Sequence, residues 1–348
     1  MLSTQGVSAA LNPLRELIDP DMRAVDMLIR RRLESDVVLI GQVAEYIIAG
    51  GGKRLRPALV LLAAGSLGYR GQDHHELAAV IEFIHTATLL HDDVVDESEL
   101  RRGRDTANAR FGNPASVLVG DFLYSRSFQM MVGLGNVRVL EVLADATNTI
   151  AEGEVMQLLN VHDADLDEAR YLEVVRRKTS KLFEAAARLG AIVGRASPKI
   201  EAGLAAYGTH LGTAFQLLDD VLDYSGDLEQ TGKNLGDDLN EGKPTLPLIY
   251  VMRKGSAAQA LAVRDAIEKG GRDSFDEVLA AIHSTGALEY SRNRARVEAQ
   301  RACAAIDALL GSAYKDSLVE LASFAADRDH SSNAFPPCGP SVHRLARL

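Results

Sequence analysis

Two aspartate clusters with the same spacing are the clearest chemical signal in the chain. Asp92-Asp93-Val94-Val95-Asp96 ends one apolar run, and Asp219-Asp220-Val221-Leu222-Asp223 ends another. On a helix, the first and third aspartates of each cluster share one face and repel each other. Carboxylates that face a bundle interior need a counter-charge or a metal ion. Hard oxygen donors without His or Cys suit Mg²⁺, which completes its shell with water and substrate phosphates. The pair therefore predicts a multi-metal site for a diphosphate, whereas either cluster alone would also fit a solvated acidic helix cap.

Basic residues accompany both clusters, as the binding of a diphosphate requires. Gly51-Gly52-Lys53-Arg54-Leu55-Arg56-Pro57 places three cations at a glycine hinge that opens a helix, where backbone N–H groups favour anions. Arg also grips phosphate through two parallel hydrogen bonds. Further candidates follow the first cluster, lie within a helix, or bracket a long loop: Arg101, Arg102, Lys178, Lys233 and Lys243. Each alone is more typical of a solvated surface charge, so the argument rests on their joint placement beside the carboxylates.

The composition limits the possible classes of protein. The 348 residues are 47% hydrophobic and 25% charged, which is typical of a globular chain. With 38 Lys and Arg against 48 Asp and Glu, the net charge is −10, so a general nucleic-acid binder is not expected. The two cysteines form no disulfide framework and no metal-ligand spacing. Neither a spanning apolar run nor a secretory signal is evident, and a cytoplasmic location is expected.

Helical periodicity dominates the chain, and hairpin signals are missing. The runs Leu77, Val80, Ile81, Ile84, Thr88, Leu89 and Leu211, Phe215, Leu218, Leu222 both follow helical spacing. Between Pro57 and Pro244 only two prolines occur, so long helices are allowed. The elements that position the clusters are therefore predicted to form an all-α, single-domain helical bundle over residues 1–330, around a central active-site cavity.

Several boundaries can be read from glycine, proline and polar residues. A helix is predicted to begin near Pro57, and Gly112-Asn113-Pro114 is expected to separate two helices. Residues 163–167 form a polar loop in which Asp165 or Asp167 is a candidate helix cap. Residues 226–247 are predicted to form a long functional loop. The tail 331–348, with three prolines, is expected to be disordered.

Taken together, these motifs resemble the trans-type polyprenyl diphosphate synthase family over nearly the whole chain up to His330. The stretch from Ile81 to Gly120, which includes the segment from Phe83 to His91 directly before the first aspartates, is most similar to the octaprenyl, long-chain members. So is the stretch from Gly232-Lys233-Asn234 through Asp237-Asp238 to Gly242-Lys243-Pro244-Thr245-Leu246-Pro247. The resemblance implies an all-α bundle, usually a homodimer, whose substrates are isopentenyl diphosphate and an allylic diphosphate.

The resemblance also implies a role for each matching residue. Asp92, Asp96 and Asp219 would bind about three Mg²⁺ ions, or Mn²⁺ in their place, with Asp93, Asp220 and Asp223 supporting them. Together with Lys178 these six aspartates form the expected catalytic group. The allylic diphosphate would be held by Arg101, Lys178 and Lys243, with Thr179, Gln216 and Lys233 nearby. The isopentenyl diphosphate site would consist of Lys53, Arg56, His85 and Arg102. The tail is a departure, because related chains often end in basic residues near the site; Arg328 is the candidate here, and the added tail puts that role in doubt.

The expected reaction is ionisation of the allylic diphosphate, attack by the C=C bond of isopentenyl diphosphate, and loss of a proton to the released diphosphate. His85 is a rival base, although the resemblance makes it a phosphate contact. Positions four and eight before Asp92 lie roughly 6 and 12 Å below the metals on a helix, and they are Thr88 and Ile84. Short-chain members of the family place an aromatic floor there, so small Ala87 and Thr88 predict a longer product. Phe128, Met130 and Met131 are candidates for a deeper floor, although Met at helical spacing is more often core packing.

The prediction is thus a synthase that extends farnesyl or geranylgeranyl diphosphate to about forty carbons. Each CH₂ group of the product that the protein buries adds ~0.8 kcal/mol of product affinity. Transfer of the product to a membrane and use as a quinone side chain are expected. The alternatives are a shorter- or longer-chain synthase and a non-catalytic subunit of a heteromeric synthase, which would lack one cluster. A terpene cyclase would need no second basic site, a His-Asp phosphohydrolase would leave the second cluster unexplained, and a structural scaffold would leave both unexplained.

Overall fold

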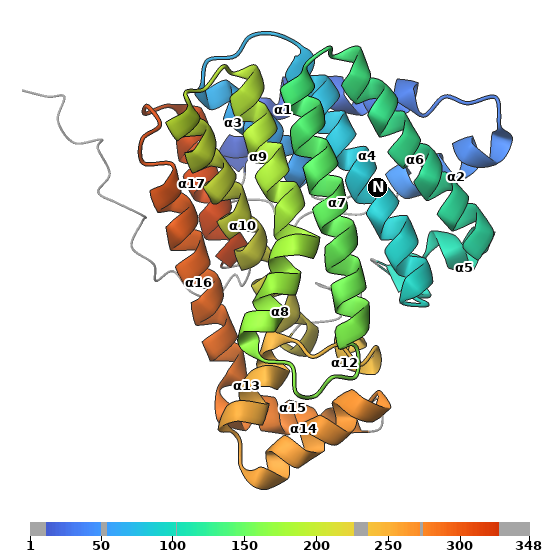
Figure 1. The fold of residues 1–348 in the computed structure, drawn as a ribbon, viewed down its shortest axis with the longest axis vertical. Helices are drawn as coiled ribbons and strands as arrows, with labels where there is room; N and C mark the ends of the chain where they lie inside the picture. Colours follow the sequence, from blue (N-terminus) through green and yellow to red (C-terminus); the bar gives the residue numbers. More distant parts are fainter. Residues whose placement is uncertain (1–11, 50–53, 102, 226–235, 272–273, 327–348) are drawn as a thin grey trace, which may run out of the picture.

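The computed structural model describes residues 12–49, 54–101, 103–225, 236–271 and 274–326, and within these ranges the chain is almost entirely helical (Figure 1). The helices of the first half are α1 (Asn12–Arg32), α2 (Val38–Ala49), α3 (Leu55–Ser66), α4 (Asp73–Val95), α5 (Ala107–Phe111), α6 (Asn113–Gly133) and α7 (Val137–Asn160). Those of the second half are α8 (Glu168–Val175), the π-helical turn η1 (Arg176–Ser180), α9 (Lys181–Val193), α10 (Pro198–Ser225), α12 (Asp237–Asn240), α13 (Leu246–Lys254), α14 (Ala257–Lys269), α15 (Phe275–Thr285), α16 (Ala287–Ala305) and α17 (Ala313–Ala326). The all-α prediction is confirmed.

The long helices run side by side, and α13 to α15 gather at the lower end of the bundle in Figure 1. Helix α4 packs along α6, α3 packs on α9, and α10 lies between α9 and α16. Among the described residues, no helix combines the length and apolar character needed to cross a bilayer. The only strands in these ranges are β1 (Leu100–Arg101) and β2 (Arg104–Asp105), a short antiparallel pair directly after α4.

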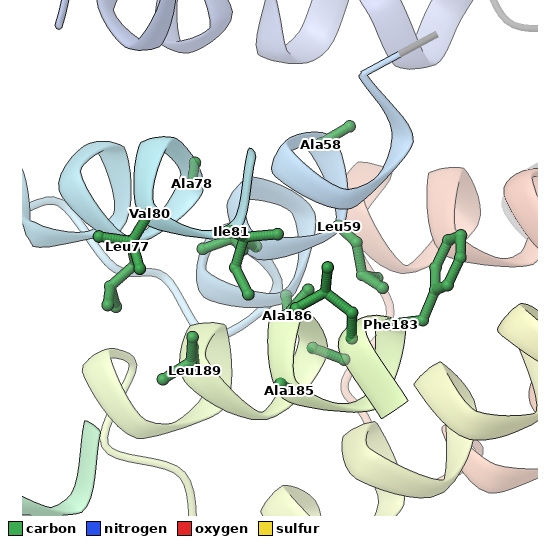
Figure 2. Close-up of a cluster of buried hydrophobic side chains, with 14 of the residues drawn as sticks. Ala58, Leu59, Leu77, Ala78, Val80, Ile81, Phe183, Ala185, Ala186 and Leu189 are labelled. Carbon is green, nitrogen blue, oxygen red and sulfur yellow. The ribbon is translucent and has the colours of Figure 1, made fainter. Parts of the chain in front are cut away.

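The core explains why α4 is held so firmly. Figure 2 shows Leu77 and Ile81 of α4 with Leu59 of α3 and Ala186 and Leu189 of α9, all fully buried. The apolar residues of α4 predicted from helical spacing lie on this helix as expected. Burial of each leucine or isoleucine contributes about 1.5–3 kcal/mol. The end of α4 that carries the first aspartate cluster therefore projects from a rigid support.

Local boundaries agree with the sequence in most places. Helix α5 ends and α6 begins at Gly112 and Asn113, and the Asp167 carboxylate caps α8 by accepting a hydrogen bond from the Arg170 amide (2.8 Å). The helix expected near Pro57 begins two residues earlier, at Leu55. The predicted loop 226–247 is wrong in its second half. There Asp237–Asn240 forms a helical turn after Gly236, and α13 starts at Leu246. Residues 226–235 and the tail 331–348 lie outside the described residues.

Candidate active site

The first aspartate cluster ends α4, and its three side chains are not equally accessible. Asp93 is buried, with 4% of its surface exposed, whereas Asp92 and Asp96 are half-buried. Asp93 accepts hydrogen bonds from Nε and Nη2 of Arg101 on β1 (2.9 and 2.6 Å). Burial raises the pKa of Asp93, and Arg101 opposes that shift. The charge of the buried Asp93 carboxylate is thus compensated by Arg101 of the hairpin, while the two predicted metal ligands are more accessible.

Two lysines from distant segments reach those accessible carboxylates. Lys178 of η1 lies 3.4 Å from an oxygen of Asp92 and forms a 2.5 Å ion pair with Glu154 of α7. Lys243, in the turn before α13, binds Asp96 (2.7 Å) and Glu241 (2.6 Å). Burial alone would lower the pKa of each lysine, but the surrounding carboxylates outweigh it and raise both pKa values. Both ammonium groups therefore stay charged beside the first cluster.

The second cluster lies near the end of α10, and its most buried member, Asp220, is held by neutral donors. Asp220 is 2% exposed and accepts hydrogen bonds from the Tyr171 hydroxyl and from Nε2 of Gln216 (2.8 Å). Burial raises its pKa to about 8, and the carboxylate of Asp238 adds to the shift. Asp223, 9% exposed, accepts a hydrogen bond from the Asp238 amide (3.3 Å). Asp219 is the half-buried member. As in the first cluster, the predicted metal ligand is more accessible than its supporting carboxylates.

Two series of contacts connect the two aspartate clusters across the end of the bundle. In the first, Lys178 touches Asp92, and the hydroxyl of the next residue, Thr179, donates to Oε1 of Gln216 (3.0 Å), which in turn holds Asp220. In the second, Lys243 binds Asp96, and its amide donates to the carbonyl oxygen of Asp238 (2.8 Å).

The amide of Asp238 donates in turn to Asp223, which completes the second series of contacts. The expectation that the two clusters converge, rather than face opposite sides of the molecule, agrees with this geometry.

The turn that carries Lys178 is π-helical instead of the regular helix expected from the sequence. A π turn inserts one extra residue into a helix and is frequent at functional sites. Two glycines make room for it: a Cβ at Gly153 of α7 would lie 2.6 Å from the Lys178 amide nitrogen. A Cβ at Gly212 of α10 would lie 2.6 Å from the Cα of Ser180. The turn is thus packed between α7 and α10, with Lys178 placed toward one cluster and Thr179 toward the other.

The predicted isopentenyl diphosphate site is described in part. Nη1 of Arg56 lies 3.2 Å from Nε2 of His85, and its guanidinium stacks over the ring of Phe183 at 4.3 Å. Burial lowers the pKa of Arg56 to about 10, while the nearby carboxylates of Glu82 and Asp219 raise it. Arg56 therefore stays charged at neutral pH and is electrostatically coupled to the second cluster. Its Nε is buried and has no hydrogen-bond partner among the described residues. Lys53, Arg102 and Lys233 lie outside the described residues.

Five polar residues at this site were missed by the sequence analysis: Glu154, Gln157, Tyr171, Asp238 and Glu241. Glu154 is the most perturbed of them. Burial and the neighbouring Asp92 raise its pKa to about 7, although Lys178 opposes the shift. Gln157 accepts a hydrogen bond from Lys178 at 2.5 Å. A Glu and a Gln three residues apart share one helix face, and that spacing is the signal that would have indicated a polar stripe on α7.

The predicted chain-length residues all lie within or against one apolar core. Ile84, Ala87 and Met131 are fully buried, and the half-buried Thr88 donates its hydroxyl to the His85 carbonyl oxygen (2.8 Å). Phe128 is 44% exposed, so its assignment as a deeper floor is wrong for the single chain. It lies on an outward face of α6, where helical spacing alone cannot tell core from surface.

A cavity of about 110 Å³ opens on a neighbouring face of α4. His85, Thr86, Leu89 and Asp93 of α4 line it, together with Arg101 and apolar residues of α1 and α2. The cavity includes neither Asp92 nor Asp96, so the carboxylates expected to bind metal lie outside it. This partly open cavity next to His85 thus adjoins the candidate site without containing Asp92 or Asp96.

The structure is thus an all-α bundle in which two aspartate clusters converge, and two lysines reach the first of them. The polyprenyl synthetase family model matches residues 37–283. The octaprenyl diphosphate synthase of Escherichia coli (strain K12) is 55% identical over 320 residues, covering 92% of this chain and 99% of that protein. The octaprenyl diphosphate synthase of Haemophilus influenzae is 53% identical, covering 92% and 98%.

A crystal structure of a polyprenyl synthase from Caulobacter crescentus CB15, complexed with calcium and isoprenyl diphosphate, superposes with a TM-score of 0.88. It is 43% identical, and the match covers 93% of this chain and 99% of that one. The chain therefore belongs to the polyprenyl synthetase family. The predicted family, fold class and prenyltransferase activity are confirmed.

Proposed function

We propose that this chain is a long-chain trans-polyprenyl diphosphate synthase that adds isopentenyl diphosphate units to farnesyl or geranylgeranyl diphosphate, to about forty carbons. The observation that carries the proposal is the junction of the two aspartate clusters through Lys178 and Lys243. Its 55% identity to an octaprenyl diphosphate synthase supports the product class. The retention of both aspartate clusters argues against a non-catalytic subunit.

The donor set fits Mg²⁺. Asp92, Asp96 and Asp219 are accessible, offer hard carboxylate oxygens and have no His or Cys donor in their clusters. Burial raises the pKa values of the neighbouring Asp93, Asp220 and Glu154, so these carboxylates are ionised at a cost that a nearby divalent cation would lower. When bound, Mg²⁺ supplies charge neutralisation for the leaving diphosphate. We propose about three ions, with Mn²⁺ as a substitute.

Side chains of the protein bind and orient the two substrates. Lys178, Lys243 and Arg101 hold the allylic diphosphate, and Thr179 and Gln216 orient it. Arg56 and His85, 3.2 Å apart, hold isopentenyl diphosphate, with Lys53, Arg102 and Lys233 proposed to complete both sites. The allylic C–O bond breaks, and the diphosphate leaves with the electron pair. The C=C bond of isopentenyl diphosphate then attacks the carbocation, and the departing diphosphate takes the proton.

The apolar walls have two roles. They keep water from quenching the carbocation, and they contain the growing product along the face of α4 that carries Thr88 and Ile84. Each CH₂ buried adds ~0.8 kcal/mol, so a five-carbon unit adds about 3 kcal/mol or more and product release becomes slow. We propose that release occurs to a membrane, that the protein works in the cytoplasm, and that the product serves as a quinone side chain.

We also propose a homodimer. Large apolar side chains are exposed along α6 and α7: Val117, Leu118, Phe128, Val132, Val155, Leu158 and Leu159. Exposed apolar side chains gathered on two neighbouring helices are typical of an interaction surface. Light scattering should give twice the chain mass, and Leu118→Glu combined with Leu159→Glu should lower it to one chain. A monomeric wild type would refute the dimer.

Product analysis tests the function. Purified protein incubated with radiolabelled isopentenyl diphosphate, farnesyl diphosphate and Mg²⁺ should yield a long product of about eight prenyl units, and chelation of the metal should abolish it. A product of twenty carbons or fewer would contradict the long-chain assignment. No incorporation would support the non-catalytic subunit instead.

A further inference from the structure

A second cluster of metal-ligating side chains lies far from the aspartates. Asp21 of α1 approaches His74 and His75 in the first turn of α4, and one ligand atom from each lies within 4.8 Å of the others. Asp92 is 18 residues further along α4, so a rise of 1.5 Å per residue separates the two places by about 27 Å. This cluster is therefore independent of the diphosphate site.

The distances are close to those of a metal centre. Nε2 of His75 lies 2.9 Å from Oδ1 of Asp21, and Nε2 of His74 lies 3.7 Å from the same oxygen. Zinc sites place His nitrogen and carboxylate oxygen about 2.0–2.2 Å from the ion, which sets ligand atoms about 3.4 Å apart in a tetrahedron. The two separations from Asp21 differ from this value by about 0.5 and 0.3 Å, so both histidine nitrogens lie close to metal-ligand spacing from the shared oxygen.

His74 is the second observation that points to a ligand. It is 7% exposed, and its Nδ1 has no hydrogen-bond partner among the described residues. Its Nε2, at 3.7 Å from Asp21, is beyond hydrogen-bond distance. Buried polar groups in native proteins are normally hydrogen-bonded, so the unpaired Nδ1 of this buried imidazole needs an explanation.

Aromatic contacts hold the His74 ring in place. It stacks on His75 with ring centroids 4.1 Å apart, and Tyr69 meets it edge-on at 5.2 Å. Burial, helped by His75, lowers the pKa of His74 to about 4, whereas Asp21 and Asp73 oppose the shift. Asp73 and Glu76 in the same turn offset the positive end of the helix dipole.

We propose that Asp21, His74 and His75 form a structural site for a borderline divalent metal ion of the Zn²⁺ class, which clamps α1 to the start of α4. Two imidazoles and one carboxylate select Zn²⁺, Co²⁺ or Ni²⁺ over Mg²⁺, which prefers oxygen ligands alone. Water or another small donor completes the shell from the side of Asp21, whose side chain is 32% exposed. Because α4 carries the first aspartate cluster at its other end, the metal stabilises the helix that positions the active site.

The test is a Co²⁺ titration of the metal-stripped full chain in excess Mg²⁺, which occupies the aspartate clusters. The wild type should bind one Co²⁺ with a tetrahedral visible absorption spectrum, and Zn²⁺ should displace it. His75→Gln and Asp21→Asn should each weaken binding by at least the 10–100-fold that even loss of an outer-shell partner costs. Both residues are partly exposed, so these variants are expected to fold, which circular dichroism checks; His74→Gln is a third variant.

Two controls separate this site from other sources of the signal. His283→Gln changes an exposed histidine of α15, and Asp92→Asn changes the aspartate site; both should retain the Co²⁺ spectrum. The spectrum should also be accompanied by a metal-dependent rise in melting temperature that is absent in His75→Gln. A wild type without the spectrum, or a spectrum lost in Asp92→Asn and kept in His75→Gln, would overturn the proposal.

Discussion

The two aspartate clusters share one spacing, yet the protein compensates their charge in different ways. In the first cluster, each aspartate has a cation beside it: Lys178 at Asp92, Arg101 at Asp93 and Lys243 at Asp96. In the second, Asp220 is held by the hydroxyl of Tyr171 and the amide of Gln216, and burial raises its pKa to about 8.

This difference in charge compensation shows how one aspartate motif can have two roles. A cation-paired carboxylate keeps its charge in a partly dry environment, because the opposite charge offsets the cost of desolvation. A buried carboxylate with only neutral donors is ionised at a greater cost and gains more when a divalent cation arrives. The cations of the first cluster are thus already placed to bind substrate phosphate. In the second cluster, the charge of Asp220 depends more on a bound metal ion for its compensation.

Replacing a predicted ligand should have the largest effect. Asp92→Asn and Asp219→Asn should each lower kcat/KM by about 10²–10³ or more, because the charge that gathers metal at the diphosphate is removed. Steady-state incorporation of isopentenyl diphosphate at saturating Mg²⁺ measures this. Asp276→Asn, on the exposed side of α15, is the control and should be unchanged. A loss below tenfold in either variant would remove that aspartate from the metal site.

Removing the groups that compensate the aspartate charges should affect the two clusters to different extents. Lys178→Met leaves Asp92 and Glu154 without their shared cation and should lower kcat/KM by about 10²-fold. Tyr171→Phe removes one hydrogen bond to Asp220 and should cost about 0.5–1.5 kcal/mol, which is about three- to tenfold. The same kinetic assay compares them. Equal effects would contradict the division between cation-paired and neutrally held carboxylates.

The helix that carries the first cluster should also set the product length. Ala87 is fully buried one turn and a half before Asp92, and Ala87→Phe should block the channel and shorten the product. Overpacking is expected to cost about 1–3 kcal/mol of stability. Chromatography of the dephosphorylated products measures the length, and Ala87→Ser is the matched small control. Unchanged length in a folded Ala87→Phe variant would refute this assignment.

Replacing Glu201, a cation-paired carboxylate away from the site, should have the smallest effect. Glu201 also serves as a reference for how the stability contribution of such a pair depends on pH. Burial tends to raise the pKa of Glu201, but hydrogen bonds from Arg188 and Arg138 outweigh it and lower the pKa below its usual value. Its stabilising contribution is therefore complete above the pKa of the unfolded chain and is lost as the pH falls through the lower folded value.

Glu201→Gln should destabilise the protein by about 1–2 kcal/mol at neutral pH, since both arginines are partly exposed. Urea unfolding at several pH values should show this difference shrinking in acid. A difference that grows as the pH falls would reverse the assigned sign.

Much of the molecule could be predicted from local patterns. Helical spacing placed Leu77 and Ile81 in the core, and the repeated i, i+4 aspartates located both clusters, because these signals depend only on nearby residues. Glu154 could not be assigned, since its role comes from the approach of α7 to Lys178. The π turn was equally hidden, because the close packing of Gly153 and Gly212 against it comes from helices distant in the sequence.

The most direct test of the central claim is where divalent ions bind relative to both clusters. Crystals grown with Mn²⁺ and an unreactive allylic thiolodiphosphate should show anomalous peaks that connect the diphosphate to Asp92 and Asp96 on one side and to Asp219 on the other. Peaks at one cluster only, or a diphosphate bound away from both, would contradict the account.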